Sequence, residues 1–201
     1  MARTALIPSF LFAVAALAVG APAYASAPGL EARVLEEVNY ARTRPADFAR
    51  LLRDYRNHPE EGRTSIEGPG ALDEAIEFLE RQAPLPPLRA DVRLARSAAN
   101  YAQDQGPQGY TGHVSADGAT LGDRIHRQQV WSMSSAEAIS YGYENARDVV
   151  RQLIVDDGVS SRGHRKVLFD TMLRFAGVGC GPHRVYGAMC VIDFSGPMIA
   201  R

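Results

Sequence analysis

The chain has 201 residues, of which 46% are hydrophobic and 22% charged, a balance typical of a soluble globular protein rather than a disordered, collagenous or repeat chain. Its 22 Lys and Arg residues and 23 Asp and Glu residues give a formal net charge of −1, so no global field would recruit nucleic acid or anionic lipid. This length suits one domain and leaves little room for two.

The first 25 residues have the features of a signal peptide. Arg3 precedes an apolar run from Leu6 to Val19, and Ala23-Tyr24-Ala25 offers a cleavage site of the A-x-A type. The run is too short to span a bilayer comfortably, and a retained N-terminal helix is the alternative. We therefore expect a signal peptide over residues 1–25, a single domain over residues 26–201, and a secreted or periplasmic protein without a transmembrane anchor.

Five segments have apolar residues at helical spacing, with proline or capping residues at several of their starts. They run from Leu30 to about Arg42, from Pro45 through Leu52, from Asp73 to Leu79, from Asp91 to before Gly106, and from Asn145 through Ile154 to a stop at Gly158. The fourth segment is rich in alanine, which permits close packing against another element. Residues 57–70 and 106–131 are predicted to be mostly loop.

Two late segments, 175–180 and 185–194, are rich in Val, Ile and aromatic residues and predict antiparallel strands. Helices first and strands late indicate an α+β layered domain, with room for a further strand whose place the pattern does not fix. The only cysteines, Cys180 and Cys190, favour a disulfide in an exported chain. A tight turn at 181–184 would place Cys180 opposite Val185, so the bridge requires a wider loop or a pairing between non-adjacent registers.

The candidate chemistry lies in a dispersed polar set, because the common hydrolase, zinc-protease and nucleotide motifs are absent from the sequence. The set comprises His113, Glu137, the pair Asp156-Asp157, and His164. Two imidazoles and two carboxylates suit either a divalent cation or an acid and base pair. Their spacing matches no local ligand motif, and each residue taken alone is more often a cap, a turn residue or a surface residue.

Helical phase places the side chains of Asp156 and Asp157 near the apolar side of their helix. A carboxylate there needs a cation, a histidine or hydrogen-bond donors, and His164 or Arg165 is the nearest candidate partner. A plain salt bridge between Asp157 and an arginine is the alternative. Among the other residues considered, we expect structural or solvated roles for His58 and His126, a place near the site rim for His183, and groove-lining or packing roles for Trp131, Tyr141 and Tyr143.

Several short motifs follow one another along nearly the whole chain after the leader, in the order in which they occur in one protein family. They are Val38-Asn39-Tyr40-Ala41-Arg42-Thr43-Arg44-Pro45, Gly112-His113, Glu137 in its Ser-Tyr-Gly context, Asp156-Asp157-Gly158-Val159 with Arg162-Gly163-His164-Arg165, and Gly177-Val178-Gly179. Together they resemble the CAP superfamily, which includes cysteine-rich secretory proteins, antigen 5, plant pathogenesis-related 1 proteins and bacterial proteins of the SCP type.

The resemblance implies a three-layer α-β-α sandwich with a central antiparallel sheet, and a cleft that holds His113, Glu137, Asp156 and His164. In this family such a tetrad can bind zinc or another divalent cation, and other surfaces have been linked to lipid binding. Here Asp156 stands where the family usually has Glu, and alanines flank Glu137 in place of the usual Gly and Asn.

We therefore expect an exported binding module whose cleft takes a cation and a lipid or peptide ligand without turnover. One alternative is a metal-dependent hydrolase of peptides or esters with Glu137 or Asp156 as general base. The other alternative is a structural protein of the cell envelope, in which the tetrad is an internal hydrogen-bond cluster.

Overall fold

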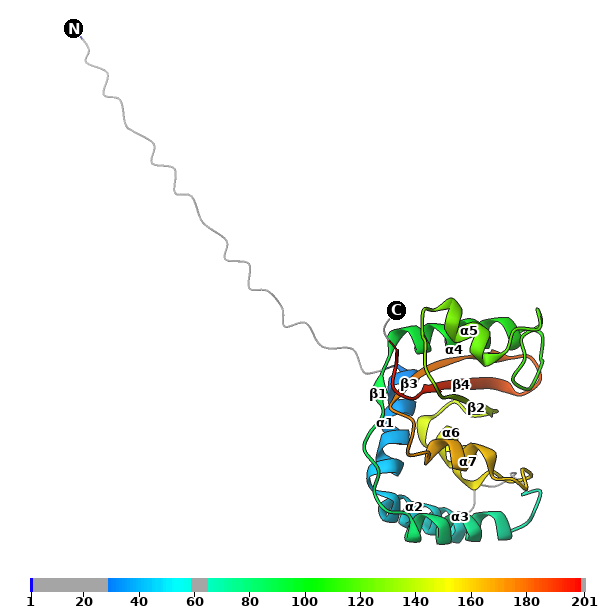
Figure 1. Cartoon of the computed structure of the whole chain (residues 1–201). Helices are drawn as coiled ribbons and strands as arrows, with labels where there is room; N and C mark the ends of the chain where they lie inside the picture. Colours follow the sequence, from blue (N-terminus) through cyan, green and yellow to red (C-terminus); the bar gives the residue numbers. More distant parts are fainter. Residues whose placement is uncertain (2–28, 59–64, 200–201) are drawn as a thin grey trace.

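A sheet of four strands lies between two layers of helices in the computed structural model (Figure 1). The structure describes residue 1 and residues 29–58 and 65–199. Apart from Met1, the predicted signal peptide lies outside these described residues. The elements are α1 (Leu30–Thr43), α2 (Pro45–Asn57), α3 (Gly70–Arg81), β1 (Arg89–Ala90), α4 (Val92–Gln105), α5 (Leu121–Arg127), β2 (Ser135–Tyr141), α6 (Ala146–Val155), α7 (Gly163–Leu168), β3 (Phe175–His183) and β4 (Gly187–Ser195).

The strands lie in the order β1-β3-β4-β2. The three long strands β3, β4 and β2 pair antiparallel, whereas the two-residue β1 pairs parallel with the start of β3. Helices α4 and α5 lie above the sheet in Figure 1, and α6, α7, α2 and α3 lie below it. This arrangement confirms the expected α-β-α sandwich and adds one short parallel pairing at its edge.

The largest buried cluster lies on the side of the sheet that faces α1 and α6. It combines the apolar faces of α1, α2, α3 and α6 with side chains of β3 and β4 such as Val178, Ile192 and Phe194. On the other side the contact with the sheet is closer, because α4 presents alanines to glycines of β3. A Cβ atom added to Gly177 or Gly179 would lie about 2 Å from the α4 backbone (1.9 Å and 2.1 Å). The alanine-rich face predicted from sequence therefore packs directly on the sheet.

Cys180 and Cys190 form a disulfide across the β3 and β4 hairpin. The two residues are direct register partners, with a Cα to Cα distance of 4.1 Å. The tight turn at residues 181–184 that was considered from the sequence does not form. Strand β3 continues through His183, and only residues 184–186 form the turn, so the strands are long enough to bring the two cysteines opposite each other.

Several element ends differ from the sequence-based prediction for local reasons. Helix α3 extends beyond Asp73 and Leu79 at both ends. Helix α5 was missed in a segment expected to be mostly loop, although Thr120 and Asp123 form a capping box at its start. Asp91 and Asn145 do cap α4 and α6, as predicted. The unplaced strand is β2, which carries Glu137.

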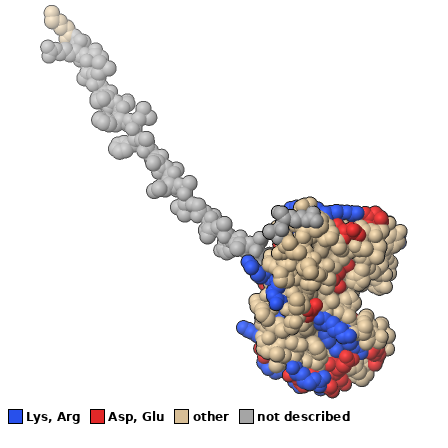
Figure 2. Space-filling model, in the orientation of Figure 1, with Lys and Arg blue, Asp and Glu red and all other residues tan. Residues whose placement is uncertain are grey.

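None of the described helices is both long and apolar enough to cross a lipid bilayer. On the face seen in Figure 2, acidic and basic side chains are interspersed and neither sign dominates. The mixed surface agrees with the near-zero net charge of the chain.

Candidate functional site

A cleft of about 530 Å³ opens at the edge of β2, between the loop after α4 and the connection from α6 to α7. The four residues predicted from sequence come together around it. His113 lies in the loop after α4, Glu137 in β2, Asp156 at the end of α6 and His164 in α7. They form two separate histidine and carboxylate pairs instead of one cluster of four ligands.

The first pair joins His113 to Glu137. The Nδ1 atom of His113 lies 2.8 Å from Glu137 Oε1, and the other carboxylate oxygen accepts a hydrogen bond from Arg124 Nη2 at 2.5 Å. The Glu137 side chain is 2% exposed, whereas that of His113 is 53% exposed. The carboxylate therefore lies behind the imidazole, with both of its oxygens in use.

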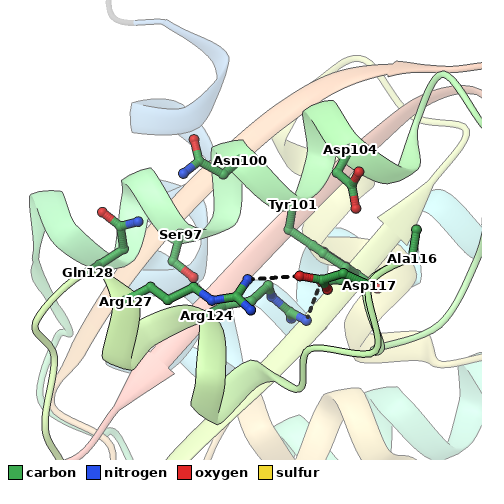
Figure 3. Close-up of a pocket in the computed structure, with 10 residues that line it drawn as sticks. Ser97, Asn100, Tyr101, Asp104, Ala116, Asp117, Arg124, Arg127 and Gln128 are labelled. Carbon is green, nitrogen blue, oxygen red and sulfur yellow. Dashed lines mark hydrogen bonds and ion pairs between the residues drawn. The ribbon is translucent and has the colours of Figure 1, made fainter.

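Arg124 of α5 fixes this pair from the side away from the cleft. Its Nη1 donates to the backbone carbonyl of His113 at 2.9 Å, and its guanidinium carbon lies 3.8 Å from the centre of the Tyr101 ring. Arg124 also lines a second hollow, of about 500 Å³, between α4, α5 and the loop at 115–117. Figure 3 shows it there beside Tyr101, with Arg127 paired to Asp117 nearer the surface.

Asp193 lies directly opposite Glu137 in the pairing of β2 with β4. It is fully buried, and neither of its oxygens has a hydrogen-bond partner of good geometry among the described residues. Burial, followed by the neighbouring negative charge of Glu137, raises the pKa of Asp193 well above its usual value. Burial next to the Glu137 carboxylate therefore favours the protonated form of Asp193.

The second pair joins His164 to Asp156. Asp156 ends α6 in the left-handed conformation, with φ of 56°, and its carboxylate accepts from the backbone N–H of His164 at 2.9 Å. Its other oxygen lies 2.7 Å from His164 Nδ1. The side chain of Asp156 is 2% exposed and that of His164 is 25% exposed. This pair thus repeats the first, with a buried carboxylate behind a more exposed ring.

The structure separates the roles of Asp156 and Asp157, which the sequence left open. The carboxylate of Asp157 points away from the histidines and accepts from the backbone N–H groups of Ile66 and Glu67, at 2.6 Å and 2.9 Å. Glu67 in turn is bound by Arg162, which lowers the pKa of Glu67 to about 2. The helical phase argument was wrong for Asp157, because the helix ends at Val155 and the left-handed Asp156 redirects the chain.

The two imidazole rings face each other across the cleft. Their centres are 6.4 Å apart and their planes are inclined by 38°. Nδ1 of each ring contacts its carboxylate, while no described residue bonds Nε2 of either ring. In the described part of the chain, no group of three or more His, Cys, Asp or Glu side chains has the geometry of a metal site. Among such residues, the cleft therefore offers two imidazole nitrogens to a bound species.

The other candidates divide between the cleft and the rest of the surface. Tyr141 lines the cleft, and His183 is buried behind it, where its Nε2 lies 3.0 Å from the carbonyl of Tyr110. His126 stacks on Trp131 outside the cleft, with ring centres 4.2 Å apart. Tyr143 lines a neighbouring hollow of about 410 Å³, and His58 is exposed beside Asp54.

Three residues that matter at the site were missed from sequence: Arg124, Asp193, and Gln152, which lines the cleft and accepts from the Tyr141 N–H. Arg124 and Gln152 lie on helices at positions whose partners are set by tertiary packing. Asp193 offered one signal, since it is the only acidic residue in the apolar segment 185–194. A charge in a predicted buried strand points to a polar neighbour, here Glu137.

Comparison with known proteins agrees with this architecture. The model of the cysteine-rich secretory protein family, abbreviated CAP, matches residues 35–194. No match is found among curated proteins.

Three bacterial proteins are among the similar solved structures. An extracellular protein with an SCP domain from Bacillus anthracis is 27% identical over 56% of this chain and 35% of its own length, with a TM-score of 0.48. An outer surface protein of Borrelia burgdorferi is 22% identical over 56% of this chain and 80% of its own, with a TM-score of 0.47. A cysteine-rich secretory protein of Staphylococcus aureus is 17% identical over 68% of this chain and 42% of its own, with a TM-score of 0.42. The chain thus spans less than half the length of the Bacillus and Staphylococcus proteins.

Proposed function

We propose, on the premise that this chain belongs to the cysteine-rich secretory protein (CAP) family, that it is an exported binding protein. Its cleft holds one divalent cation and takes a small lipid or peptide ligand, without turnover of that ligand. The observation that carries the proposal is the pair of imidazoles, His113 and His164, each backed by a buried carboxylate and each with Nε2 free of protein partners in the described structure.

The carboxylates prepare the imidazoles for a cation. A carboxylate on Nδ1 favours the tautomer that carries its proton on Nδ1, which leaves the Nε2 lone pair available as a metal ligand. His113 and His164 would therefore be the ligands, and Glu137 and Asp156 would orient them from behind. This assigns the two acids a different role from the direct ligation considered from sequence.

The two neutral imidazole ligands determine which metals the cleft would favour. Neutral imidazole suits zinc, copper and nickel, whereas calcium and magnesium prefer oxygen ligands. Zinc is therefore the first candidate. Two protein ligands are fewer than the three or four of most zinc sites, so we expect modest affinity, with water or the ligand completing the coordination.

The arrangement favours binding over catalysis. A hydrolase that used Glu137 as general base would need a free carboxylate oxygen facing the cleft, but both oxygens are engaged by His113 and Arg124. A purely structural role for the tetrad would not require the half-exposed ring of His113.

Zinc titration by calorimetry tests the proposal. We expect one site per chain in the wild type, loss of that site in both His113→Ala and His164→Ala, and no signal with calcium. His58→Ala is the matched control, because His58 also pairs with a carboxylate, Asp54, but lies on the surface outside the cleft. Absence of zinc binding by the wild type would overturn the proposal. Hydrolysis of a mixed peptide and ester library, lost with chelator and in Glu137→Gln, would favour the enzyme instead.

A further inference from the structure

Strand β2 is the last strand of the sheet, so among the residues that the structure describes no strand pairs with its outer edge. Its pairing with β4 is regular over all seven residues, and Gly142 N–H donates to Ala188 of β4 at 2.8 Å. Backbone groups alternate in direction along an antiparallel strand. The N–H and C=O of Tyr141 and Ile139 therefore point away from β4, toward the open edge.

At Tyr141 a side-chain amide occupies this edge. The N–H of Tyr141 donates to Gln152 Oε1 at 3.1 Å, and its C=O accepts from Gln152 Nε2 at 3.2 Å. The primary amide of Gln152 thus makes the two hydrogen bonds that a residue of an added strand would make. This part of the edge already accepts an amide in the geometry of strand pairing.

At Ile139 the same two backbone groups have no such partner. Ile139 lines the cleft, and no hydrogen bond from the residues that the structure describes reaches its outward N–H or C=O. Ile139 as a whole is only 5% exposed, and it lines the cleft. Unpaired backbone groups in such a place are costly, and a ligand amide would satisfy both of them.

An exposed apolar side chain also lines the cleft. Ile66 is 79% exposed, and it lines both the cleft and the neighbouring hollow that contains Leu72 and Tyr143. Its backbone N–H is bonded to Asp157, so the side chain is presented from a fixed position. An exposed aliphatic side chain held at the junction of two hollows suits contact with an apolar group of a ligand.

We propose that the ligand of the cleft is an extended peptide segment. One peptide residue pairs through its backbone with Ile139, as a short addition to the edge of β2, and a neighbouring apolar side chain packs on Ile66. A lipid chain would fill the apolar hollow but has no amide for the backbone of Ile139. This inference rests on the proposed function only in placing the ligand in the same cleft; it does not require the cation.

The test is a titration of the ¹⁵N-labelled protein, in EDTA, followed by amide chemical shifts. The probe is the end-blocked peptide acetyl-Thr-Val-Thr-Val-Thr-amide. We expect the amide of Ile139 to shift strongly and those of Ile66 and Tyr141 to shift with it. The same peptide with N-methyl groups on its three central residues should bind about tenfold more weakly or worse, because it lacks the donors for strand pairing.

Two variants make the test sharper. Ile66→Ser should weaken binding several-fold, whereas Val92→Ser, a similar change at a residue that is 72% exposed and lies outside the cleft, should not. Gln152→Ala should tighten binding, because it releases the backbone groups of Tyr141 and lengthens the open edge by one position. A merely structural role for Gln152 would not produce tighter binding.

The proposal is overturned if the peptide leaves the Ile139 amide unshifted, or if the N-methylated peptide binds equally well. It is also overturned if folded Gln152→Ala fails to bind more tightly. Dodecanoate is the lipid probe, and shifts at Ile139 with dodecanoate but not with the peptide would assign the cleft to an acyl chain. Because EDTA is present throughout, these outcomes do not depend on whether zinc binds.

Discussion

Arg124 fixes both the backbone and, through Glu137, the imidazole ring of His113. Its guanidinium donates to the backbone carbonyl of His113 at 2.9 Å and, through the other nitrogen, to the carboxylate of Glu137, whose second oxygen contacts the His113 ring. The loop that carries His113 and the partner that orients its imidazole are therefore fixed by one side chain. No short sequence motif links α5 to this histidine.

Replacement of Arg124 should weaken the proposed zinc site without changing either of its two proposed histidine ligands. Lysine cannot donate to the His113 carbonyl and the Glu137 carboxylate in the same fork geometry, so we expect Arg124→Lys to lower zinc affinity about tenfold or more. Calorimetry measures the loss. Arg127→Lys is the control, since Arg127 lies on the same helix as Arg124 but is exposed and bonds Asp117 instead of the His113 pair. Equal affinities in the two variants would show that Arg124 does not position His113.

The second histidine allows a test of tautomer control. Asp156→Asn keeps a residue that tolerates the left-handed backbone at this position. Its amide can donate to Nδ1 of His164, which would move the imidazole proton to Nε2. We expect zinc affinity to fall about 10- to 100-fold while the fold is retained. Nitrogen chemical shifts of the ring report the tautomer, and an unchanged tautomer together with unchanged affinity would contradict this account.

Asp193 should make stability depend on pH. Its pKa in the folded state is raised above the usual value of 3.8, so the fold favours the protonated acid. The stabilisation of that form is complete below the unfolded pKa and is lost as the pH rises through the folded pKa. Asp193→Asn removes the titration and keeps a side chain of nearly the same size and shape. It should stabilise the protein by about 1–3 kcal/mol at neutral pH, and by much less in acid.

Urea unfolding of both proteins between about pH 4 and pH 7 checks this difference. Asp148→Asn is a suitable control, because Asp148 is an acidic side chain paired with Arg151 and its removal should destabilise the protein at neutral pH. A constant difference in stability between wild type and Asp193→Asn at all pH values would show that Asp193 does not titrate as inferred.

The elements that the sequence predicted well are those whose signals are local. Asp91 and Asn145 cap the helices they were expected to cap, and the apolar faces of the helices beginning at Leu30 and Pro45 are buried. Capping and helical periodicity act within a few residues, so they can be recognised without knowing what packs against them.

The features that escaped prediction depend on contacts between distant segments. The end of α6 at Val155 is set by Asp156 bonding to His164, and the length of β3 is set by its pairing with β4. That His113, Glu137, Asp156 and His164 would meet in one cleft could be expected from the sequence only through family resemblance. The sequence could not show that the acids lie behind the histidines, because that order depends on how β2 and α6 are placed.

The Cys180 to Cys190 disulfide should contribute measurably to stability. It closes a loop with a sequence separation of 10, for which the chain-entropy model gives about 2–3 kcal/mol. We expect the double variant Cys180→Ala, Cys190→Ala to unfold at correspondingly lower urea concentration under non-reducing conditions. Wild type in reducing buffer is the control and should match the variant. An unchanged midpoint would mean that the disulfide adds no restriction to the unfolded chain, as would happen if the β3 and β4 hairpin persisted there.

The close approach of α4 to the sheet gives the most demanding prediction about the fold. A Cβ atom added to Gly179 would lie 2.1 Å from the backbone nitrogen of Ala99, and backbone atoms cannot move aside as a side chain can. Gly179→Ala should therefore destabilise the protein by about 3 kcal/mol or more, or prevent folding. Gly181→Ala is the matched control two residues along the same strand, because its Cβ would meet only the Ala102 methyl at 3.9 Å. Thermal unfolding of both variants decides the matter: similar melting temperatures would show that the helix and the sheet are not in backbone contact at Gly179.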